Sequence, residues 1–426
     1  MRHFLVVFLF FAGARSQAQT LYFPPVAGNT WATTDPADLG WCTDRIDSLY
    51  NFLEQKNSKA FIVLKDGRIV LEHYFGSFTA DSVWYWASAG KTLTGYLVGK
   101  AKEQGYLSLS DTSSKYLGQG WTSLTPQQED SITIRHQLTM TTGLDDGGDV
   151  YCTLPSCLTY LAPAGTRWAY HNAPYTLLEG VLENATSQNI NVYTQNVLKS
   201  QTGMTGAWIT VDYNNVFYSK ARSMARYGLL MQNRFKWNNT ALLTDVNYVN
   251  EMLNTSQGYN YAYGYLTWLN GKGSYMIPSS QVKIPGSYAP AAPLDMYAAI
   301  GKNGQIISVA PSKGLVVIRM GDDPASGEVP FTLCDDIWQR LNYVMCTSSI
   351  APKTYTFIGS GNWTNAINWS GGLIPPAILP AGDQIVIYPL GNNECILNTT
   401  QSIAAGAKLH VVINKKMTVT GSLVLQ

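Results

Sequence analysis

The sequence has 426 residues, of which 46% are hydrophobic and only 13% are charged, and its formal net charge is +1. A nearly neutral chain without a basic stripe argues against a nucleic-acid-binding protein. Beyond the first residues, no run of the sequence is long and apolar enough to cross a bilayer, and the length is sufficient for two domains.

Residues 1–18 have the pattern of a signal peptide. The basic Arg2 precedes an apolar run at 4–12, and the small residues Ser16 and Ala18 fit cleavage after position 18. No cysteine follows the apolar run directly, so a lipid anchor is not expected. We therefore expect an exported protein that is periplasmic, bound to the cell surface or secreted.

A helix and a hairpin open the mature chain. Residues 41–56 predict the helix, and apolar runs at 60–64 and 68–75 predict two strands. Asp66-Gly67 between these runs is typical of a hairpin turn. The pattern is then mainly helical to about residue 252, and its clearest segments are 86–105, 132–140, 173–185, 191–200 and 219–233.

Strand patterns return after this helical region. They lie at 259–269, 274–277, 297–300, 305–310 and 315–320, and a final helix is predicted at 331–344. Strands at both ends with helices between them predict one sheet assembled from both ends of the domain, with the first and last helices on one face. This is an α/β fold in the broad sense (α+β), with a cleft expected where the helical region meets the sheet.

The composition changes near residue 350. The segment 350–426 is rich in Gly, Pro, Thr and Ile, and strands are predicted at 355–358, 383–388, 408–413 and 417–425. We therefore expect a main domain over 19–349 and a small all-β module over 350–426. Trp363 and Trp369 fit either the core of this module or a sugar-binding platform, and the core is favoured.

The module also contains Asn368-Trp369 and a Gly-Gly-Leu-Ile-Pro-Pro run at 371–376. In general form these segments resemble C-terminal modules of exported Bacteroidetes proteins. The resemblance assigns no activity, and contact with a cell surface or a glycan is the partner hypothesis for this module.

Six cysteines in an exported chain indicate disulfides. Cys152 and Cys157 are close enough in sequence to close a small loop and are the favoured pair. Cys334 and Cys346 lie at opposite ends of the predicted helix at 331–344. Because twelve residues of helix span about 18 Å, these two cysteines are too far apart to join.

The remaining cysteines leave two arrangements open. Cys42, on the first helix, can reach either Cys334 or Cys346, which leaves Cys395 to pair with the other. Zinc is not expected, because none of the five histidines has a spacing that completes a site. We expect no metal and no organic cofactor.

Ser88 and Lys91 form an S-x-x-K motif at the start of the predicted helix at 86–105. Lys91 lies one turn after Ser88 on the same helix face. Unpaired N–H groups and the helix dipole favour negative charge at the serine, while burial and the same dipole oppose protonation of the lysine. The pair therefore predicts a serine nucleophile with an amine that accepts its proton.

A second S-x-x-K match, Ser280 to Lys283, is followed by Pro285-Gly286, which stops any helix. Its lysine has no reason to lie over its serine. An isolated match more often marks a capping serine followed by a solvated lysine, so the helical context of Ser88 selects the first match.

Two further segments supply the groups that a nucleophile and a base require. Tyr170 and Asn172 follow a Pro-x-Gly-Thr-Arg run and precede a predicted helix, which places a proton relay and an amide ligand on one turn. Lys302 and Gly304 precede the strand at 305–310. The lysine supplies a cation, and the glycine would let a substrate lie alongside as an added strand.

These motifs resemble those of the serine β-lactamase and penicillin-binding-protein superfamily, in the branch near class C β-lactamases, D-alanyl-D-alanine carboxypeptidases and related esterases. The resemblance covers roughly residues 40–345. It is carried by Ser88-x-x-Lys91, the runs at 132–144, 163–172, 202–205 and 225–230, and Gly301-Lys302-Asn303-Gly304-Gln305, in the family's order. It implies a β-lactamase/transpeptidase-like antiparallel sheet flanked by helices.

The resemblance implies Ser88 as nucleophile, Lys91 as the base or its electrostatic partner, and Tyr170 as proton relay. Asn172 is implied as the ligand of the substrate amide. Whether Lys91 or Tyr170 accepts the first proton is left open, because the titrations of the two groups are coupled.

The third motif has implied roles as well. Lys302 would place a positive charge near the substrate carboxylate or the phenol, and the N–H groups of Ser88 and Gln305 would form the oxyanion hole. Asn303 departs from the family, because β-lactamases and carboxypeptidases commonly carry a hydroxyl residue there that holds the substrate carboxylate.

The expected function is that of an exported serine hydrolase that cleaves an amide or ester bond through an acyl-enzyme at Ser88. Its substrate is a small molecule, a peptide or an ester, and a peptidase or esterase is favoured over a dedicated β-lactamase. The alternative is a non-catalytic protein that kept the fold as a binding or scaffolding module.

Overall fold

The computed structural model describes residues 21–324, 327–347 and 353–425. The expected signal peptide at 1–18 and the expected domain boundary at 349/350 lie outside these residues. Within them, no helix has both the length and the apolar character needed to span a membrane.

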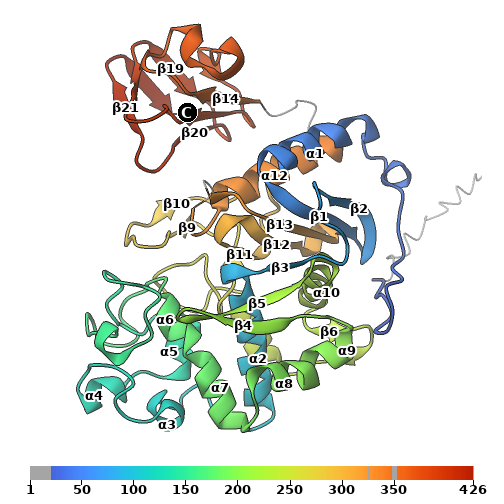
Figure 1. The fold of residues 1–426 in the computed structure, drawn as a ribbon, viewed down its shortest axis with the longest axis vertical. Coiled ribbons are helices and arrows are strands. Elements are labelled where there is room, and N and C mark those ends of the chain that lie inside the picture. The colour runs from blue at the N-terminus through green and yellow to red at the C-terminus, as the bar shows by residue number, and fades with distance from the viewer. Residues whose placement is uncertain (1–20, 325–326, 348–352, 426) are drawn as a thin grey trace, which may run out of the picture.

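A single six-stranded sheet forms the centre of the main body (Figure 1). Its strand order is β2-β1-β13-β12-β11-β8, and every neighbouring pair is antiparallel. The strands are β1 (Ser58–Lys65), β2 (Arg68–Tyr74), β8 (Trp268–Leu269), β11 (Tyr297–Gly301), β12 (Gln305–Ala310) and β13 (Leu315–Gly321). Pairing of β1 with β13 joins the two ends of the domain, as the sequence predicts.

Helices cover both faces of this sheet (Figure 1). On one side α1 (Ile46–Gln55) packs against α12 (Phe331–Val344), and both match the predicted first and last helices. On the other side α10 (Ala221–Gln232) packs against β12 and β13. Gly228 allows this approach, because a Cβ there would lie 2.5 Å from Val316 Cγ1.

The inserted region contains a small sheet that the helical pattern does not predict. Its strands are β3 (Val83–Tyr85), β5 (Asn214–Lys220) and β4 (Ala207–Val211), in that order. The expectation of an all-helical insertion is wrong here, because Trp208 and Phe217 are buried on the two sides of a hairpin with ring centroids 5.2 Å apart. A second hairpin, β6 (Lys236–Trp237) with β7 (Thr240–Ala241), lies in the same region. The helices of the inserted region include α2 (Lys91–Glu103), α5 (Ile134–Leu138), α6 (Asn172–Thr176), α7 (Leu178–Thr186), α8 (Ile190–Thr194) and α11 (Val246–Met252).

The predicted strands at 259–269 and 274–277 shorten to β8 and β9 (Ser274–Tyr275). Leu266 adopts a φ of 51°, a left-handed conformation that a continuous strand does not allow. Residues before β8 therefore form a compact loop, in which Gln257 accepts backbone N–H bonds from Tyr259 and Asn260.

The C-terminal segment folds as three small parallel sheets, each of three strands (Figure 1). The sheets are β14-β17-β20, β15-β18-β21 and β16-β19-β22. Their strands are Thr354–Phe357, Gly361–Asn362, Ile378–Leu379, Gln384–Ile387, Glu394–Leu397, Thr400–Ile403, Lys408–Val411, Lys416–Val419 and Ser422–Leu425, for β14 to β22 in turn. Each pass of the chain adds one strand to every sheet, so the module is a coil of three turns.

Trp363 and Trp369 lie inside this coil. They are 1% and 2% exposed, and their ring centroids are 4.8 Å apart. The interpretation as core residues is confirmed, and neither ring forms a surface platform for a glycan.

Two of the predicted cysteine relations are present. Cys152 is bonded to Cys157, and Cys42 is bonded to Cys346. The expected pairing of Cys395 with Cys334 is wrong, because both are free, buried thiols. Cys334 is part of α12 and lies against Ser308 of β12, whereas Cys395 belongs to the core of the C-terminal coil.

An ion-pair cluster fastens the C-terminal coil to the main body. Lys408 on β20 pairs with Asp335 and Asp336 of α12, and these side chains are 19%, 0% and 4% exposed. Asp335 also accepts a 2.6 Å hydrogen bond from the Ala291 N–H. Removal of the lysine would leave two buried carboxylates without this cationic partner.

Lys408→Met is therefore expected to lower the free energy of unfolding by about 3 kcal/mol. Urea titration of the full chain, followed by tryptophan fluorescence, measures the change. Lys416→Met is the matched control, because Lys416 pairs with Glu394 at the surface, where its side chain is 71% exposed. Equal midpoints for the two variants would contradict a buried cluster at Lys408.

Candidate active site

Ser88 lies in a 3₁₀ turn, η3 (Ala87–Gly90), and not at the start of one continuous α-helix. The α-helix α2 begins at Lys91. Ala87 has a φ of 46°, a left-handed conformation that is costly for alanine and concentrates at functional sites. This strained turn presents the Ser88 hydroxyl, which is half-buried, at the junction between the sheet and the helical region.

The side chain of Lys91 reaches back to this hydroxyl. Its Nζ lies 2.9 Å from Ser88 Oγ and 2.5 Å from Asn172 Oδ1. The residue is 2% exposed, and Nζ lies 4.3 Å from the ring centroid of Tyr175. Burial lowers the pKa of Lys91 to about 7, although the charge of Glu328 opposes this shift. A substantial fraction of Lys91 is therefore neutral near pH 7 and able to accept a proton.

Tyr170 completes the polar group. It is 4% exposed and stacks on Trp268 with centroids 5.5 Å apart. Its hydroxyl has no hydrogen-bond partner among the described residues. Burial raises the pKa of Tyr170 well above its usual range, and the nearby Ser88 hydroxyl opposes this shift in part. The phenol is thus protonated at neutral pH and available to a ligand in the cavity.

Asn172 is the first residue of α6 and is buried. Its Oδ1 accepts from Lys91, so its Nδ2 donors remain for another group. The structure therefore brings together four of the predicted residues, Ser88, Lys91, Tyr170 and Asn172, from two segments about 80 positions apart.

The third predicted motif, Lys302 to Gln305, makes its side-chain contacts with other residues than these four. Lys302 Nζ pairs with Glu328 at 2.9 Å. Gly304 lies against the guanidinium of Arg319, where a Cβ would come within 1.9 Å of Nη1. The Gln305 side chain bonds in both directions to the backbone of Gly321. None of these contacts joins the motif to the hydroxyl of Ser88.

Gly301 is the glycine that approaches the nucleophile. A Cβ on it would lie 2.9 Å from the N of Ser88 and 2.6 Å from the O of Trp86. The sequence shows two glycines three residues apart, at 301 and 304, and only the geometry of β11 distinguishes them. The sequence does not single out Gly301, whereas the role expected for Gly304 concerns the approach of a substrate and stays a prediction.

Gly301→Ala is expected to lower kcat/KM about 10- to 100-fold, because the added methyl displaces the turn that holds Ser88. Gly273→Ala is the control, since a Cβ at Gly273 meets no atom within 4 Å. Activity assays on both variants, with circular dichroism to verify folding, measure the effect. An unchanged kcat/KM in a folded Gly301→Ala variant would refute the close contact.

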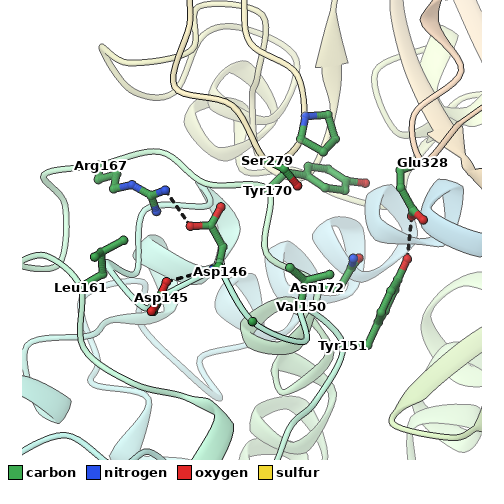
Figure 2. Close-up of a pocket in the computed structure, with 13 residues that line it drawn as sticks. Asp145, Asp146, Val150, Tyr151, Leu161, Arg167, Tyr170, Asn172, Ser279 and Glu328 are labelled. Atoms are coloured by element: carbon green, nitrogen blue, oxygen red, sulfur yellow. Dashed lines mark hydrogen bonds and ion pairs between the residues drawn. The ribbon is translucent and has the colours of Figure 1, made fainter. Parts of the chain in front are cut away.

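A cavity of about 510 Å³ opens beside these residues (Figure 2). This volume is in the range of small-molecule sites. Its lining includes Tyr170 and Asn172 from the polar group, and Asp145, Asp146 and Tyr151 from the rim loop at 145–151, which directly precedes the Cys152–Cys157 disulfide. The rim loop therefore forms part of the cavity wall.

His136 and the acidic side chains were also considered as functional groups. His136 lies in α5, where its Nδ1 accepts from the N–H of Thr133 at the helix start. Among the described residues, no group of three or more His, Cys, Asp or Glu side chains is placed to hold a metal ion.

Comparisons with solved structures concern the fold. A candidate β-lactamase from Bacteroides dorei superposes with a TM-score of 0.57 at 17% identity, over 72% of this chain and 99% of that one. A candidate 6-aminohexanoate-dimer hydrolase from Bacillus anthracis also gives 0.57, at 16% identity, over 76% and 91% of the two chains. These likenesses establish the fold.

An uncharacterized protein of Alkalihalophilus pseudofirmus is 29% identical over 147 residues, which are 32% of this chain and 40% of that relative. Residues 52–329 match the protein family described as Beta-lactamase. This match covers more than half of the sequence and includes Ser88, Lys91, Tyr170 and Asn172. The chain therefore belongs to the β-lactamase family, whose fold is that of the serine β-lactamases and penicillin-binding proteins.

Proposed function

We propose that this protein is an exported serine hydrolase that cleaves an ester or amide bond through an acyl-enzyme at Ser88. The observation that carries the proposal is the 2.9 Å contact between Lys91 Nζ and Ser88 Oγ, made by an amine whose burial lowers its pKa to about 7. A charged lysine at that distance could not take the proton of the hydroxyl, whereas a neutral one can.

Acylation follows from these positions. Neutral Lys91 accepts the Ser88 proton as the oxygen attacks the carbonyl carbon, and the electron pair of the carbonyl moves to its oxygen. The N–H of Ser88 and a second N–H from the segment that begins at Gly301 would bind this oxyanion. The tetrahedral intermediate then collapses, and the leaving oxygen or nitrogen takes a proton from Tyr170.

The pKa values of Lys91 and Tyr170 favour Lys91 as the first acceptor of the Ser88 proton. Its pKa lies near 7, whereas burial keeps Tyr170 protonated, so the phenol donates to the leaving group and recovers a proton from Lys91. In deacylation, a water loses its proton to the same pair and attacks the acyl carbon, which releases the acid and restores Ser88.

We propose a peptidase or esterase in preference to a dedicated β-lactamase. Asn303, which replaces the family's hydroxyl residue, has a φ of 61°, and its Nδ2 donates to the Tyr85 hydroxyl at 2.7 Å and to Asp322 at 3.2 Å. Its amide is thus occupied by the protein. The two disulfides support the export part of the proposal, because such bonds persist in oxidising compartments.

The test is turnover of a panel of p-nitrophenyl esters, nitrocefin and D-Ala-D-Ala peptides by the purified chain, with Ser88→Ala as the blank. The proposal expects hydrolysis of esters or peptides that the blank lacks. Equal rates for the two proteins on every compound would favour the alternative of a non-catalytic binding or scaffolding protein.

A further inference from the structure

The carboxylate of Glu328 lines the cavity and accepts hydrogen bonds from two different segments of the chain. Its Oε1 accepts from Lys302 Nζ at 2.9 Å, and its Oε2 accepts from the Tyr151 hydroxyl at 2.6 Å. Tyr151 belongs to the rim loop, whereas Lys302 follows the sheet strand β11. Figure 2 shows the Glu328 carboxylate directed toward Tyr151, on the same side of the cavity as Tyr170 and Asn172.

Glu328 also acts on the catalytic pair through its charge. It raises the pKa of Lys91 and of Tyr170, in both cases as a smaller effect than burial. Burial raises the pKa of Glu328 itself, but hydrogen bonds from Lys302 and Tyr151 outweigh it and hold this pKa below the usual range. The group is therefore an anion at neutral pH, close to the atoms that react.

The cations around the cavity already have protein partners. Lys302 is held by Glu328, and Lys91 by Ser88 and Asn172. Arg167 pairs with Asp146 at 2.6 Å through one terminal nitrogen, while its other terminal nitrogen is buried without a hydrogen-bond partner among the described residues.

The remaining charges of the lining are negative. Asp145, Asp146 and Glu328 face the cavity, and Arg167 is the one cationic side chain in the described lining. Asp145 accepts a 2.9 Å hydrogen bond from the Gly147 N–H, and among the described residues it forms no ion pair with a side chain of the lining. A substrate carboxylate entering here would meet an excess of like charge.

We infer that this site takes neutral or cationic esters or amides, and that Glu328 is the residue that rejects substrates with a carboxylate near the scissile bond. The inference rests on the proposed function and names its substrate class. Lys302, the cation expected to hold a substrate carboxylate, pairs with Glu328 and is not among the described lining residues of the cavity, whereas Glu328 is.

The size of the effect follows from charge separation. The carboxylates of a substrate and of Glu328 repel each other, and this repulsion weakens with their separation and with exposure to solvent. Solvent at this half-open rim screens much of this repulsion, so we expect discrimination of about tenfold in kcat/KM.

The experiment uses p-nitrophenyl esters of equal chain length that end in trimethylammonium, tert-butyl or carboxylate. The first two end groups have the same shape, so their comparison isolates charge. The wild-type chain is expected to hydrolyse the cationic and neutral esters about tenfold better than the anionic one. Glu328→Gln is expected to raise kcat/KM for the carboxylate ester about tenfold and to lower it for the trimethylammonium ester.

Glu394→Gln is the matched control, because it removes the same charge from the C-terminal coil and is expected to leave all three values unchanged. A wild-type preference for the carboxylate ester would overturn the inference and point to Arg167 as an anion site. Glu328→Gln changing all three values equally would also overturn it.

The two proposals fail in different ways. Hydrolysis that is lost in Ser88→Ala but prefers carboxylates refutes the inference alone. Absence of any Ser88-dependent hydrolysis refutes the proposed function and the inference with it.

Discussion

Ser88→Ala is expected to reduce kcat by about 10⁵-fold while the fold is retained. Removal of the nucleophile from a serine hydrolase leaves only binding and oxyanion stabilisation, and its measured cost in such enzymes is of this order. The half-buried hydroxyl accepts a hydrogen bond from Lys91, and its replacement by hydrogen removes only one atom at the edge of the cavity, so the fold is expected to persist. Initial rates on the best ester of the panel measure the effect.

Ser280→Ala provides the control within the same chain. Ser280 begins the second S-x-x-K match. Among the described residues, its Oγ accepts a hydrogen bond from the N–H of Val282 and not from Lys283. The Nζ of Lys283 instead lies 5.1 Å from the ring centroid of Tyr261. The rate of the Ser280→Ala variant is expected to equal that of the wild type. A loss of activity in Ser280→Ala that matched the loss in Ser88→Ala would remove the basis for choosing the first motif.

Lys91→Met is expected to lower kcat/KM by about 10²- to 10⁴-fold, the usual contribution of a general base. The substitution keeps the length of the side chain but cannot accept a proton. Because the active form of Lys91 is the neutral one, kcat/KM of the wild type should rise with pH through an apparent pKa near 7 and level off above it. The variant should lack this rise.

A profile of kcat/KM from pH 5 to 9 on one neutral ester measures both the loss of activity in Lys91→Met and the rise with pH in the wild type. Lys100→Met serves as control, because Lys100 lies on the same helix but pairs with Glu103 at its far end. A rise near pH 7 that persists in Lys91→Met would assign it to another group and contradict the role of the amine.

Much of the central sheet follows from the sequence. The strand at 305–310 and the helix at 331–344 have the predicted bounds, because their apolar residues recur at the strand and helix periods without interruption. The hairpin at Asp66-Gly67 is equally local, since both residues adopt the positive φ that its turn requires.

The features that the sequence misses depend on contacts between distant segments. The pairing of β3 with β5 joins Val83 to Lys220, and no local period reveals it. The coil of the C-terminal module likewise depends on parallel pairing of strands about 24 residues apart, such as Gln384 with Lys408. A helical pattern also does not separate a 3₁₀ turn at Ser88 from the α-helix that follows it.

The site shows the same division. Ser88, Lys91, Tyr170 and Asn172 belong to short motifs that can be read locally. Glu328 belongs to no motif, and only the folded chain shows that it lines the cavity and pairs with Lys302.

The most direct test is the position of a covalent adduct. The full chain is incubated with a fluorophosphonate probe, digested and mapped by mass spectrometry. The mechanism expects one modified peptide, with the phosphonate on Ser88 and no labelling of the Ser88→Ala variant. A probe attached to another serine, or equal modification of both proteins, would show that the hydroxyl beside Lys91 is not the nucleophile.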